Sequence, residues 1–250
     1  MLVRRLTRDD IVGVFAGLRP LLSGESEETS QLSREHAVAR PVPGLVTIAG
    51  GKYTTYRVMA KDAIDAAVPD LSRHPGPSVT EHVPLVGADG YAALMNQAER
   101  LAEQYGLPVW RIRHLLDRYG SMLEEVLAPG VDEPALLESV PGADTYIGAE
   151  IRYGATHEGA LHLDDLLARR TRISIETPHR GTESAVAAAE IVADVLGWSP
   201  ERLQAEVDVY LARVAAERAS QDEATDLSAD AARLVAPDTR KVAVGRALDD

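Results

Sequence analysis

The sequence has no cysteine in its 250 residues. This absence excludes disulfide bonds, thiol catalysis, cysteine-ligated zinc and iron–sulfur clusters. Redox chemistry in this chain would therefore need a bound cofactor.

Long apolar runs are also missing. No stretch approaches the about 18 uninterrupted apolar residues of a membrane-spanning helix. The first residues, MLVRRLTRDD, lack the apolar stretch of a signal peptide. We therefore expect a cytoplasmic, water-soluble protein, while peripheral attachment to the inner face of the cell membrane stays open.

Positive charge is scarce. The only lysines are Lys52, Lys61 and Lys241, and 26 basic residues face 39 acidic ones, for a net charge of −13. Residues 1–125 hold 14 basic and 16 acidic residues, whereas residues 126–250 hold 12 and 23. Because an acidic surface repels phosphate backbones, we expect no nucleic-acid partner.

The N-terminal third contains strand signals. An apolar run at 11–22 that contains Gly17 and Pro20 predicts a buried strand running into a turn. Residues 34–40 and 44–49 predict a hairpin that turns at Pro43-Gly44. From Thr54 the apolar spacing changes to between three and four, which predicts a helix of about 14 residues.

The remainder of the chain has helical periodicity. Start signals include Pro108, a capping box of Ser121 with Glu124, and Ser199 before Pro200, and stop signals include Gly106, Gly120 and Gly197. The predicted helices cover 91–105, 108–118, 121–127, 144–158, 162–172, 182–196 and 200–219.

These elements predict an α+β protein. We expect a strand-containing domain at 1–68, a linker rich in proline and glycine at 69–90, an all-helical domain at 91–220 and a flexible tail at 221–250.

The segment VTIAGGKYTTYR at 46–57 is the most informative local pattern. Gly50 and Gly51 allow unusual backbone angles and close approach of a flat ligand. The helix that follows offers unpaired N–H groups, Lys52 adds a charge, and Thr54 and Thr55 add hydroxyls. An anion or an electron-rich ring would be stabilised there; alternatively, the glycines only turn the chain and a threonine only caps the helix.

Other motifs narrow the choice. A Walker A loop would need glycine at 46 and serine or threonine at 53, where the chain has Val46 and Tyr53. Neither G-x-G-x-x-G nor G-x-S-x-G occurs. His157 and His162 are five residues apart, which separates them by about 140° on a helix, so we expect no metal site.

Two arginines lie near the glycine pair in sequence order. Arg19 follows the first predicted strand and Arg34 opens the second. If these strands share a sheet with 46–50, both guanidinium groups converge near Lys52 and suit a phosphate or carboxylate. A surface position is the alternative for each. The basic run ARRTR at 168–172 fits a helix C-terminus, or else interdomain salt bridges or anion contact.

Four segments together carry a resemblance: GLRPLL at 17–22, SREHAV at 33–38, GLVTIAGGKYTTYRVMA at 44–60 and EIRYGATHEGALHLDDLLARRTRISIETPHRG at 150–181. They resemble the C-terminal part of the FAD-dependent glycerol-3-phosphate dehydrogenases, which oxidise glycerol 3-phosphate to dihydroxyacetone phosphate and reduce quinone. The resemblance covers residues 7 to about 220.

The resemblance implies roles for individual residues. Gly50, Gly51, Lys52, Thr54 and Thr55 match the segment that passes the FAD ring, in the last strands and helix of a Rossmann-like FAD-binding domain. It also implies that Arg19, Arg34 and Lys52 bind the substrate. The implied mechanism is hydride transfer from C2 of glycerol 3-phosphate to the flavin, with a base removing the hydroxyl proton.

The family's N-terminal region carries the Rossmann fingerprint and the expected catalytic histidine, and residue 1 here lies just before the last strands. We therefore expect no catalytic residue in this chain, weak or absent FAD binding, and no dehydrogenase activity without an N-terminal FAD domain. Unpaired strand edges predict a homodimer or aggregation.

Three hypotheses follow. The chain is the C-terminal portion of such a dehydrogenase, with its partner domain in the same or a split polypeptide; it is a non-catalytic helical interaction or dimerisation module; or it binds a small anion through Arg19, Arg34 and Lys52.

Overall fold

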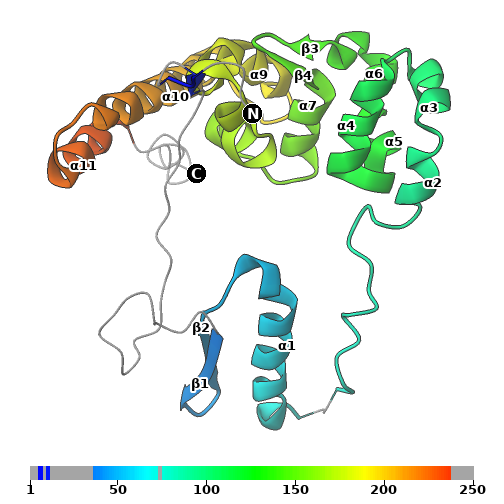
Figure 1. Cartoon of the computed structure of the whole chain (residues 1–250), viewed down its shortest axis with the longest axis vertical. Coiled ribbons are helices and arrows are strands. Elements are labelled where there is room, and N and C mark those ends of the chain that lie inside the picture. Colours follow the sequence, from blue (N-terminus) through cyan, green and yellow to red (C-terminus); the bar gives the residue numbers. More distant parts are fainter. Residues whose placement is uncertain (1–4, 8–9, 12–35, 73–74, 238–250) are drawn as a thin grey trace. The chain divides into compact units, whose positions relative to one another are not determined.

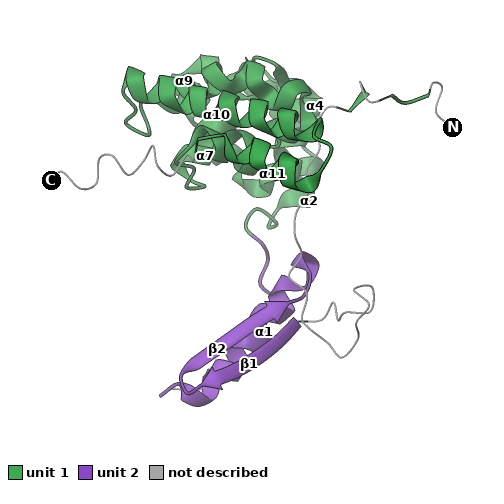
Figure 2. Cartoon of the chain, turned by 90° about the vertical axis from the view of Figure 1, so that its left-hand side faces the viewer, with its two compact units in different colours: residues 1–14, 86–250 green, residues 15–85 purple. Residues whose placement is uncertain are grey.

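The computed structural model describes residues 5–7, 10–11, 36–72 and 75–237. The chain divides into two compact units (Figure 2). Unit 1 comprises residues 1–14 and 86–250, and unit 2 comprises residues 15–85. The predicted strand at 11–22 lies, apart from Ile11, outside the described residues.

Unit 2 contains a β-hairpin followed by a helix (Figure 1). Strands β1 (His36–Val42) and β2 (Leu45–Gly50) are antiparallel, with His36 opposite Gly50 and Val42 opposite Leu45. Gly44 in the turn has φ of 78°, which favours glycine. The described residues confirm the predicted hairpin, with strand bounds shifted by one or two residues. The helical segment begins with the 3-10 turn η2 (Tyr53–Thr55), continues as α1 (Tyr56–Ala67) and ends in η3 (Val68–Asp70).

Helix α1 and the turn η3 contact the hairpin. His36 Nε2 lies 2.8 Å from Asp62 Oδ2 of α1, and Arg40 pairs with Asp70 of η3. None of the described side chains between 36 and 85 is buried. The described part of unit 2 therefore has no hydrophobic core of its own.

Unit 1 is mainly helical. Its α-helices and strands are α2 (Tyr91–Met95), α3 (Ala98–Tyr105), α4 (Val109–Tyr119), α5 (Leu123–Leu127), α6 (Pro129–Asp132), β3 (Ser139–Val140), β4 (Ala143–Ile147), α7 (Gly148–Thr156), α8 (Ile173–Glu176), α9 (Ala185–Val192), α10 (Pro200–Gln221) and α11 (Asp226–Leu234). The other helical segments of unit 1 are the 3-10 helices η4 (Gly120–Met122), η5 (Pro134–Leu137) and η7 (Pro178–Ser184) and the π-helix η6 (Asp165–Arg170).

Two hydrophobic clusters form the core of unit 1. One contains Leu163 and Leu166 together with Val207 and Tyr210 of α10. The other is built on α3, α4 and α5, with Leu115 as a fully buried member. Helix α7 contributes to both clusters, because Ile151 belongs to the first while Ala149 and Tyr153 belong to the second. Helix α7 therefore joins the two halves of the core.

Near the start of the helical part of unit 1, two backbone segments cross in close contact. Ser121 N donates to Gly87 O at 2.9 Å, and a Cβ placed on Gly120 would lie 1.9 Å from that same oxygen. Gly120 has φ of 57°, so glycine is needed there for both conformation and space. This contact fixes the end of the predicted 69–90 segment to helix α4.

Several predicted elements differ in detail. The helix expected over 144–158 begins only at Gly148, because Gly142, with φ of 71°, turns the chain into strand β4. The expected capping box of Ser121 with Glu124 is wrong, since Met122 is the N-cap residue of α5. The prediction of Ser199 as a cap is confirmed, because its hydroxyl accepts from Arg202 N at 3.2 Å.

Three further segments depart from the expected pattern. The helix expected over 162–172 contains six residues of π-helix, and the one expected over 182–196 is α-helical only from Ala185 to Val192. The segment expected to be a flexible tail contains α11, whose N-cap Thr225 accepts from Ser228 N at 3.2 Å. Local side-chain caps outweigh weak periodicity there.

Candidate functional site

The glycine pair ends strand β2 and turns the chain toward α1. Gly50 and Gly51 have φ of 79° and 83°, a region that other residues rarely adopt. A Cβ on Gly51 would lie 2.5 Å from Met59 Sδ. Glycine at 51 is therefore required by the fold, whether or not a ligand also approaches it.

A side-chain hydroxyl stabilises the backbone of this turn, and the side chain of Lys52 is exposed. Thr55 Oγ1 donates to Lys52 O at 2.9 Å and accepts from Lys52 N at 3.3 Å. Lys52 and Thr54 are exposed, and within the described residues the Lys52 ammonium forms no ion pair. Thr55 is thus occupied as the cap, whereas Lys52 and Thr54 face solvent.

The structure brings together only some of the predicted site residues. Gly50, Gly51, Lys52, Thr54 and Thr55 form one continuous turn. Arg19 and Arg34 lie outside the described residues, so their convergence on Lys52 stays a prediction.

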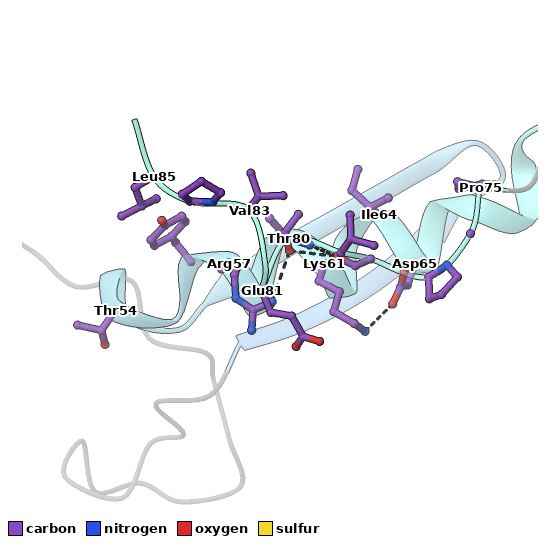
Figure 3. Close-up of a pocket in the computed structure, with 17 residues that line it drawn as sticks. Thr54, Arg57, Lys61, Ile64, Asp65, Pro75, Thr80, Glu81, Val83 and Leu85 are labelled. Carbon is purple, nitrogen blue, oxygen red and sulfur yellow. Dashed lines mark hydrogen bonds and ion pairs between the residues drawn. The ribbon is translucent and has the colours of Figure 1, made fainter. Parts of the chain in front are cut away.

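A groove of about 790 Å³ in unit 2 was not predicted from the sequence. It runs between α1 and the segment 75–85, and Thr54 also lines it (Figure 3). Regular periodicity identified α1, but a segment rich in proline and glycine carries no pattern that places it beside a helix.

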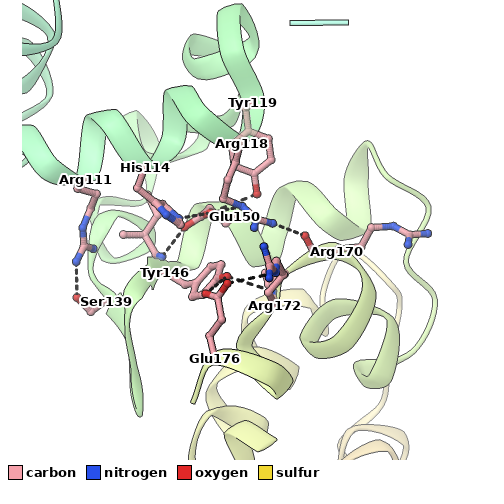
Figure 4. A network of polar contacts seen from close by, with 12 residues as sticks. Arg111, His114, Arg118, Tyr119, Ser139, Tyr146, Glu150, Arg170, Arg172 and Glu176 are labelled. Carbon is pink, nitrogen blue, oxygen red and sulfur yellow. Dashed lines mark hydrogen bonds and ion pairs between the residues drawn. The ribbon is translucent and has the colours of Figure 1, made fainter. Parts of the chain in front are cut away.

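Unit 1 contains a buried carboxylate at the junction of its two clusters. Glu150 is fully buried, and its Oε1 lies 3.1 Å from His114 Nε2 and 3.4 Å from Arg118 Nε (Figure 4). Its Oε2 accepts from Ile147 N at 3.0 Å. The sequence signal was an acidic residue between apolar positions of a helix, where a buried charge needs partners.

Two tyrosines enclose the Arg118 guanidinium of this network. Its central carbon lies 5.3 Å from the ring centre of Tyr146 and 5.6 Å from that of Tyr119, which permits cation–π attraction. Burial raises the pKa of both phenols. Tyr146 OH donates to Glu176 Oε2 at 2.8 Å and accepts from Arg172 N at 3.2 Å. These contacts link α4, β4, α7 and α8, so the network stabilises the fold, although the buried Arg118 Nε forms no hydrogen bond.

The basic run at 168–172 makes its contacts inside unit 1. Arg169 pairs with Asp164 and Asp165, Arg170 Nε donates to Glu158 O at 2.6 Å, and Arg172 pairs with Glu176 at 3.2 Å. All of these contacts lie within unit 1, and Arg169 and Arg170 belong to the last turn of η6, as the interpretation of a helix C-terminus expects.

A left-handed turn follows that run. His179 and Arg180 have φ of 54° and 56°, ahead of Gly181 at 66°. Tyr210 OH donates to Arg180 O, and Arg180 Nε lies 2.7 Å from Glu217 Oε2. Two consecutive non-glycine residues in this region cost free energy, which these contacts with α10 offset.

The histidines are distributed among separate contacts. His162 Nδ1 lies 2.9 Å from Glu206 Oε1, and His157 stacks on Tyr153 with ring centres 4.5 Å apart. Over the described ranges, no group of three or more histidine, aspartate or glutamate side chains is arranged to hold a metal ion. The helices of the described part include none that is long and apolar enough to cross a membrane.

Comparison with known proteins identifies related chains. Residues 78–203 match the model of a family described as the C-terminal domain of alpha-glycerophosphate oxidase. The chain is 58% identical over 240 residues to glycerol-3-phosphate dehydrogenase 2 of Mycobacterium tuberculosis strain H37Rv, which covers 96% of this chain and 41% of that protein. It is 34% identical over 206 residues to the mitochondrial glycerol-3-phosphate dehydrogenase of Mus musculus, covering 80% and 28%. The chain thus spans about two fifths of its mycobacterial relatives.

A solved structure shares the fold. The glycerol-3-phosphate dehydrogenase from Bacillus halodurans, complexed with FAD, superposes with a TM-score of 0.56 at 24% identity. The match covers 71% of this chain and 36% of that one.

Proposed function

Because this chain belongs to the family described as the C-terminal domain of alpha-glycerophosphate oxidase, we propose that it is the C-terminal portion of an FAD-dependent glycerol-3-phosphate dehydrogenase. The proposed reaction oxidises sn-glycerol 3-phosphate to dihydroxyacetone phosphate and passes the electrons to a quinone. Peripheral contact with the inner face of the membrane is part of this proposal, since a lipid-soluble quinone is reached there.

The observation that carries the proposal is Lys52, which directly follows two glycines of positive φ, is exposed and forms no ion pair with the described residues. The positively charged ammonium of Lys52 can stabilise the phosphate of the substrate or a flavin ring that gains electrons. Helix α1 is 12 residues long, and its N-terminal end adds positive potential at the same point. A cation held at the start of a helix therefore suits this chemistry.

The residues present fit one side of an FAD site. When bound, FAD supplies the acceptor for the hydride that leaves C2 of the substrate. Gly50 and Gly51 leave the backbone accessible, and Thr54 presents its hydroxyl to solvent beside them. Thr55 supports the site indirectly, because its hydroxyl holds the Lys52 backbone.

The substrate phosphate is assigned to Arg19, Arg34 and Lys52. A doubly charged phosphate accepts several charge-assisted hydrogen bonds, and two guanidinium groups with one ammonium match that demand. The sequence has no G-x-G-x-x-G fingerprint for the adenosine diphosphate part of FAD. We therefore assign FAD binding and the base to a complex of this chain with an N-terminal FAD domain.

Reconstitution tests the proposal. The 250-residue chain is purified alone and together with the part of the Mycobacterium tuberculosis relative that precedes the matched segment, and flavin absorbance and glycerol 3-phosphate oxidation by a soluble dye are measured. The pair should bind FAD and oxidise the substrate, and the chain alone should do neither. Absence of both activities from the pair would contradict the proposal.

A lysine variant locates the site within the pair. Lys52→Ala should lower kcat/KM for glycerol 3-phosphate by about 10- to 100-fold, because a hydrogen bond to a charged group contributes about 1.5–3 kcal/mol. Arg100→Gln is the control, since Arg100 is an exposed cation of unit 1 that bonds only to glutamines within the described residues. Equal effects of the two substitutions on kcat/KM would show that Lys52 does not belong to the site.

A further inference from the structure

A polar pair connects the first residue of β1 with the middle of α1. His36 Nε2 lies 2.8 Å from Asp62 Oδ2, and the side chain of His36 is 18% exposed. An ionised carboxylate only accepts hydrogen bonds, so the Nε2–H of His36 donates to Asp62. Lys61 is a weaker partner of this carboxylate, because its ammonium lies 3.8 Å from Asp62 Oδ1 but 2.7 Å from Asp65 Oδ2. His36 is therefore the main partner of Asp62 among the described residues.

His36 also lies directly against the glycine turn. It is the Cα partner of Gly50 in the antiparallel pairing of β1 with β2. A Cβ placed on Gly51 would lie only 3.2 Å from the Cβ of His36. Lys52 is the next residue of the chain. A displacement of His36 is therefore transmitted through close contacts to the backbone that carries Lys52.

Polar contacts, not a hydrophobic core, fix α1 against the hairpin. Helix α1 lies alongside both strands (Figures 1 and 2), yet no described side chain of unit 2 is buried. Two ion pairs join the helical segment to the hairpin within the described residues: His36 with Asp62, and Arg40 with Asp70 of η3. Asp70 lies at the end of the helical segment that is remote from the glycine turn. Only the His36 pair includes a residue that contacts the turn.

We propose that His36 is a positioning residue, whose hydrogen bond to Asp62 holds the glycine turn, and with it Lys52, in place for the flavin and the substrate phosphate. This inference rests on the proposed function. His36 acts through Lys52, and it neither gives nor takes a proton in the reaction. A misplacement of about 1 Å can cost about 100-fold in rate, so a hydrogen bond that touches neither flavin nor substrate is sufficient to control catalysis.

Backbone order parameters of the 250-residue chain test the positioning without FAD or substrate. They are measured by ¹⁵N relaxation for Gly50, Gly51 and Lys52. We expect about 0.85 in the unsubstituted chain and below about 0.6 in His36→Ala and Asp62→Ala, because each substitution removes the same hydrogen bond. Unchanged values would overturn the proposal. A loss of order that extends through α1 would show that unit 2 unfolds, and would overturn a positioning role.

Matched substitutions at residue 36 separate the hydrogen bond from the size of the side chain. His36→Gln keeps an N–H donor near the position of Nε2 and should retain the order of the turn. His36→Asn carries the same amide on a shorter side chain that reaches only the position of Nδ1, so it should behave as His36→Ala. Equal order in the two amide variants would contradict the proposal.

Asp70→Ala is the control for loss of an ion pair between the same two elements. It removes the pair with Arg40 at the end of the helical segment remote from Gly50 and Gly51. The order parameters of 50–52 should stay unchanged, and kcat/KM of the reconstituted pair should change less than about twofold. An effect equal to that of Asp62→Ala would contradict a specific role of His36.

Activity of the reconstituted pair tests whether His36 acts through Lys52. His36→Ala should lower kcat/KM for glycerol 3-phosphate by about tenfold, and His36→Gln by less than about threefold. In a Lys52→Ala background, His36→Ala should lower kcat/KM by less than about threefold more, because residues that act through one group are not additive. Equal losses in both backgrounds would overturn the proposal.

The two proposals fail separately. A reconstituted pair without dye-linked oxidation would refute the proposed function, and the order parameters of the chain alone would still decide whether His36 holds the turn. Oxidation by the pair, with a turn that stays ordered in His36→Ala, would refute this inference alone.

Discussion

The two units contain similar apolar amino acids but differ in whether these side chains are buried. Unit 1 buries two clusters of aliphatic and aromatic side chains joined by α7. Unit 2 contains comparable residues, yet Leu45, Tyr56 and Ile64 are 46%, 50% and 60% exposed, and none of its described side chains is buried. A hairpin with one helix has too little chain to enclose a core. Apolar surface in unit 2 is therefore available for ligands and partners, whereas in unit 1 it stabilises the fold.

Amide hydrogen exchange measures this contrast directly. Amides of α7 should exchange roughly a thousandfold more slowly than those of α1, because α7 opens only when the core of unit 1 opens. Exchange is followed by NMR or mass spectrometry on the whole chain. Equal protection of the two helices would mean that unit 2 is covered by another surface in solution, and the comparison would break.

Removing the central carboxylate of unit 1 is the largest expected stability change. Glu150→Ala should lower the free energy of unfolding by about 3–5 kcal/mol, because Arg118 would keep a charge without its buried partner. Glu99→Ala is the control: its pair with Arg113 is exposed, and we expect a loss below about 1 kcal/mol. Urea denaturation measures both free energies of unfolding. Similar losses in the two variants would show that the buried contacts of Glu150 contribute no more to stability than an exposed ion pair.

Truncating one apolar residue in each unit sharpens the comparison. Leu163→Ala should cost about 2–5 kcal/mol, since Leu163 is fully buried and leaves a cavity. Ile64→Ala should cost less than about 0.5 kcal/mol, because its side chain is mostly in water. Thermal and urea unfolding should agree on this order, and a large loss from Ile64→Ala would reveal a hidden core in unit 2.

High pH gives the smallest expected effect. Burial and a hydrogen bond to Glu125 raise the pKa of Tyr153 to about 12, against about 10 in an unfolded chain. Between these values the unfolded state binds fewer protons, so the free energy of unfolding falls as pH rises. Tyr153→Phe should flatten this fall, and Tyr53→Phe, at a residue that is 91% exposed, should not. Urea titrations at pH 9, 10 and 11 measure the slope, and equal slopes in both variants would assign the fall to other groups.

Local patterns predicted much of the architecture. Alternation and the Pro43-Gly44 turn predicted the hairpin, and Gly106 ends α3 with φ of 65° as its position indicated. Strand β4 was missed because its apolar spacing also fits a helix, and only pairing with β3 decides between them. The Glu150 network was missed because His114 and Glu150 are 36 residues apart.

In the candidate site, the order of residues was sufficient to predict the turn at Gly50–Lys52 but not the groove. Gly50, Gly51 and Lys52 are adjacent, so one short segment specifies their geometry. The groove requires 75–85 to lie along α1, and nothing in the composition of that segment indicates it.

By itself, the sequence determined the hairpin and the helix that follows it, the absence of thiol chemistry and the position of a cation at a helix start, because each depends on neighbouring residues. Only the tertiary structure decided which charges are buried together and which apolar side chains stay in water. Those outcomes depend on how much surface distant segments can remove from solvent, and 36–85 contains too little chain to do so alone.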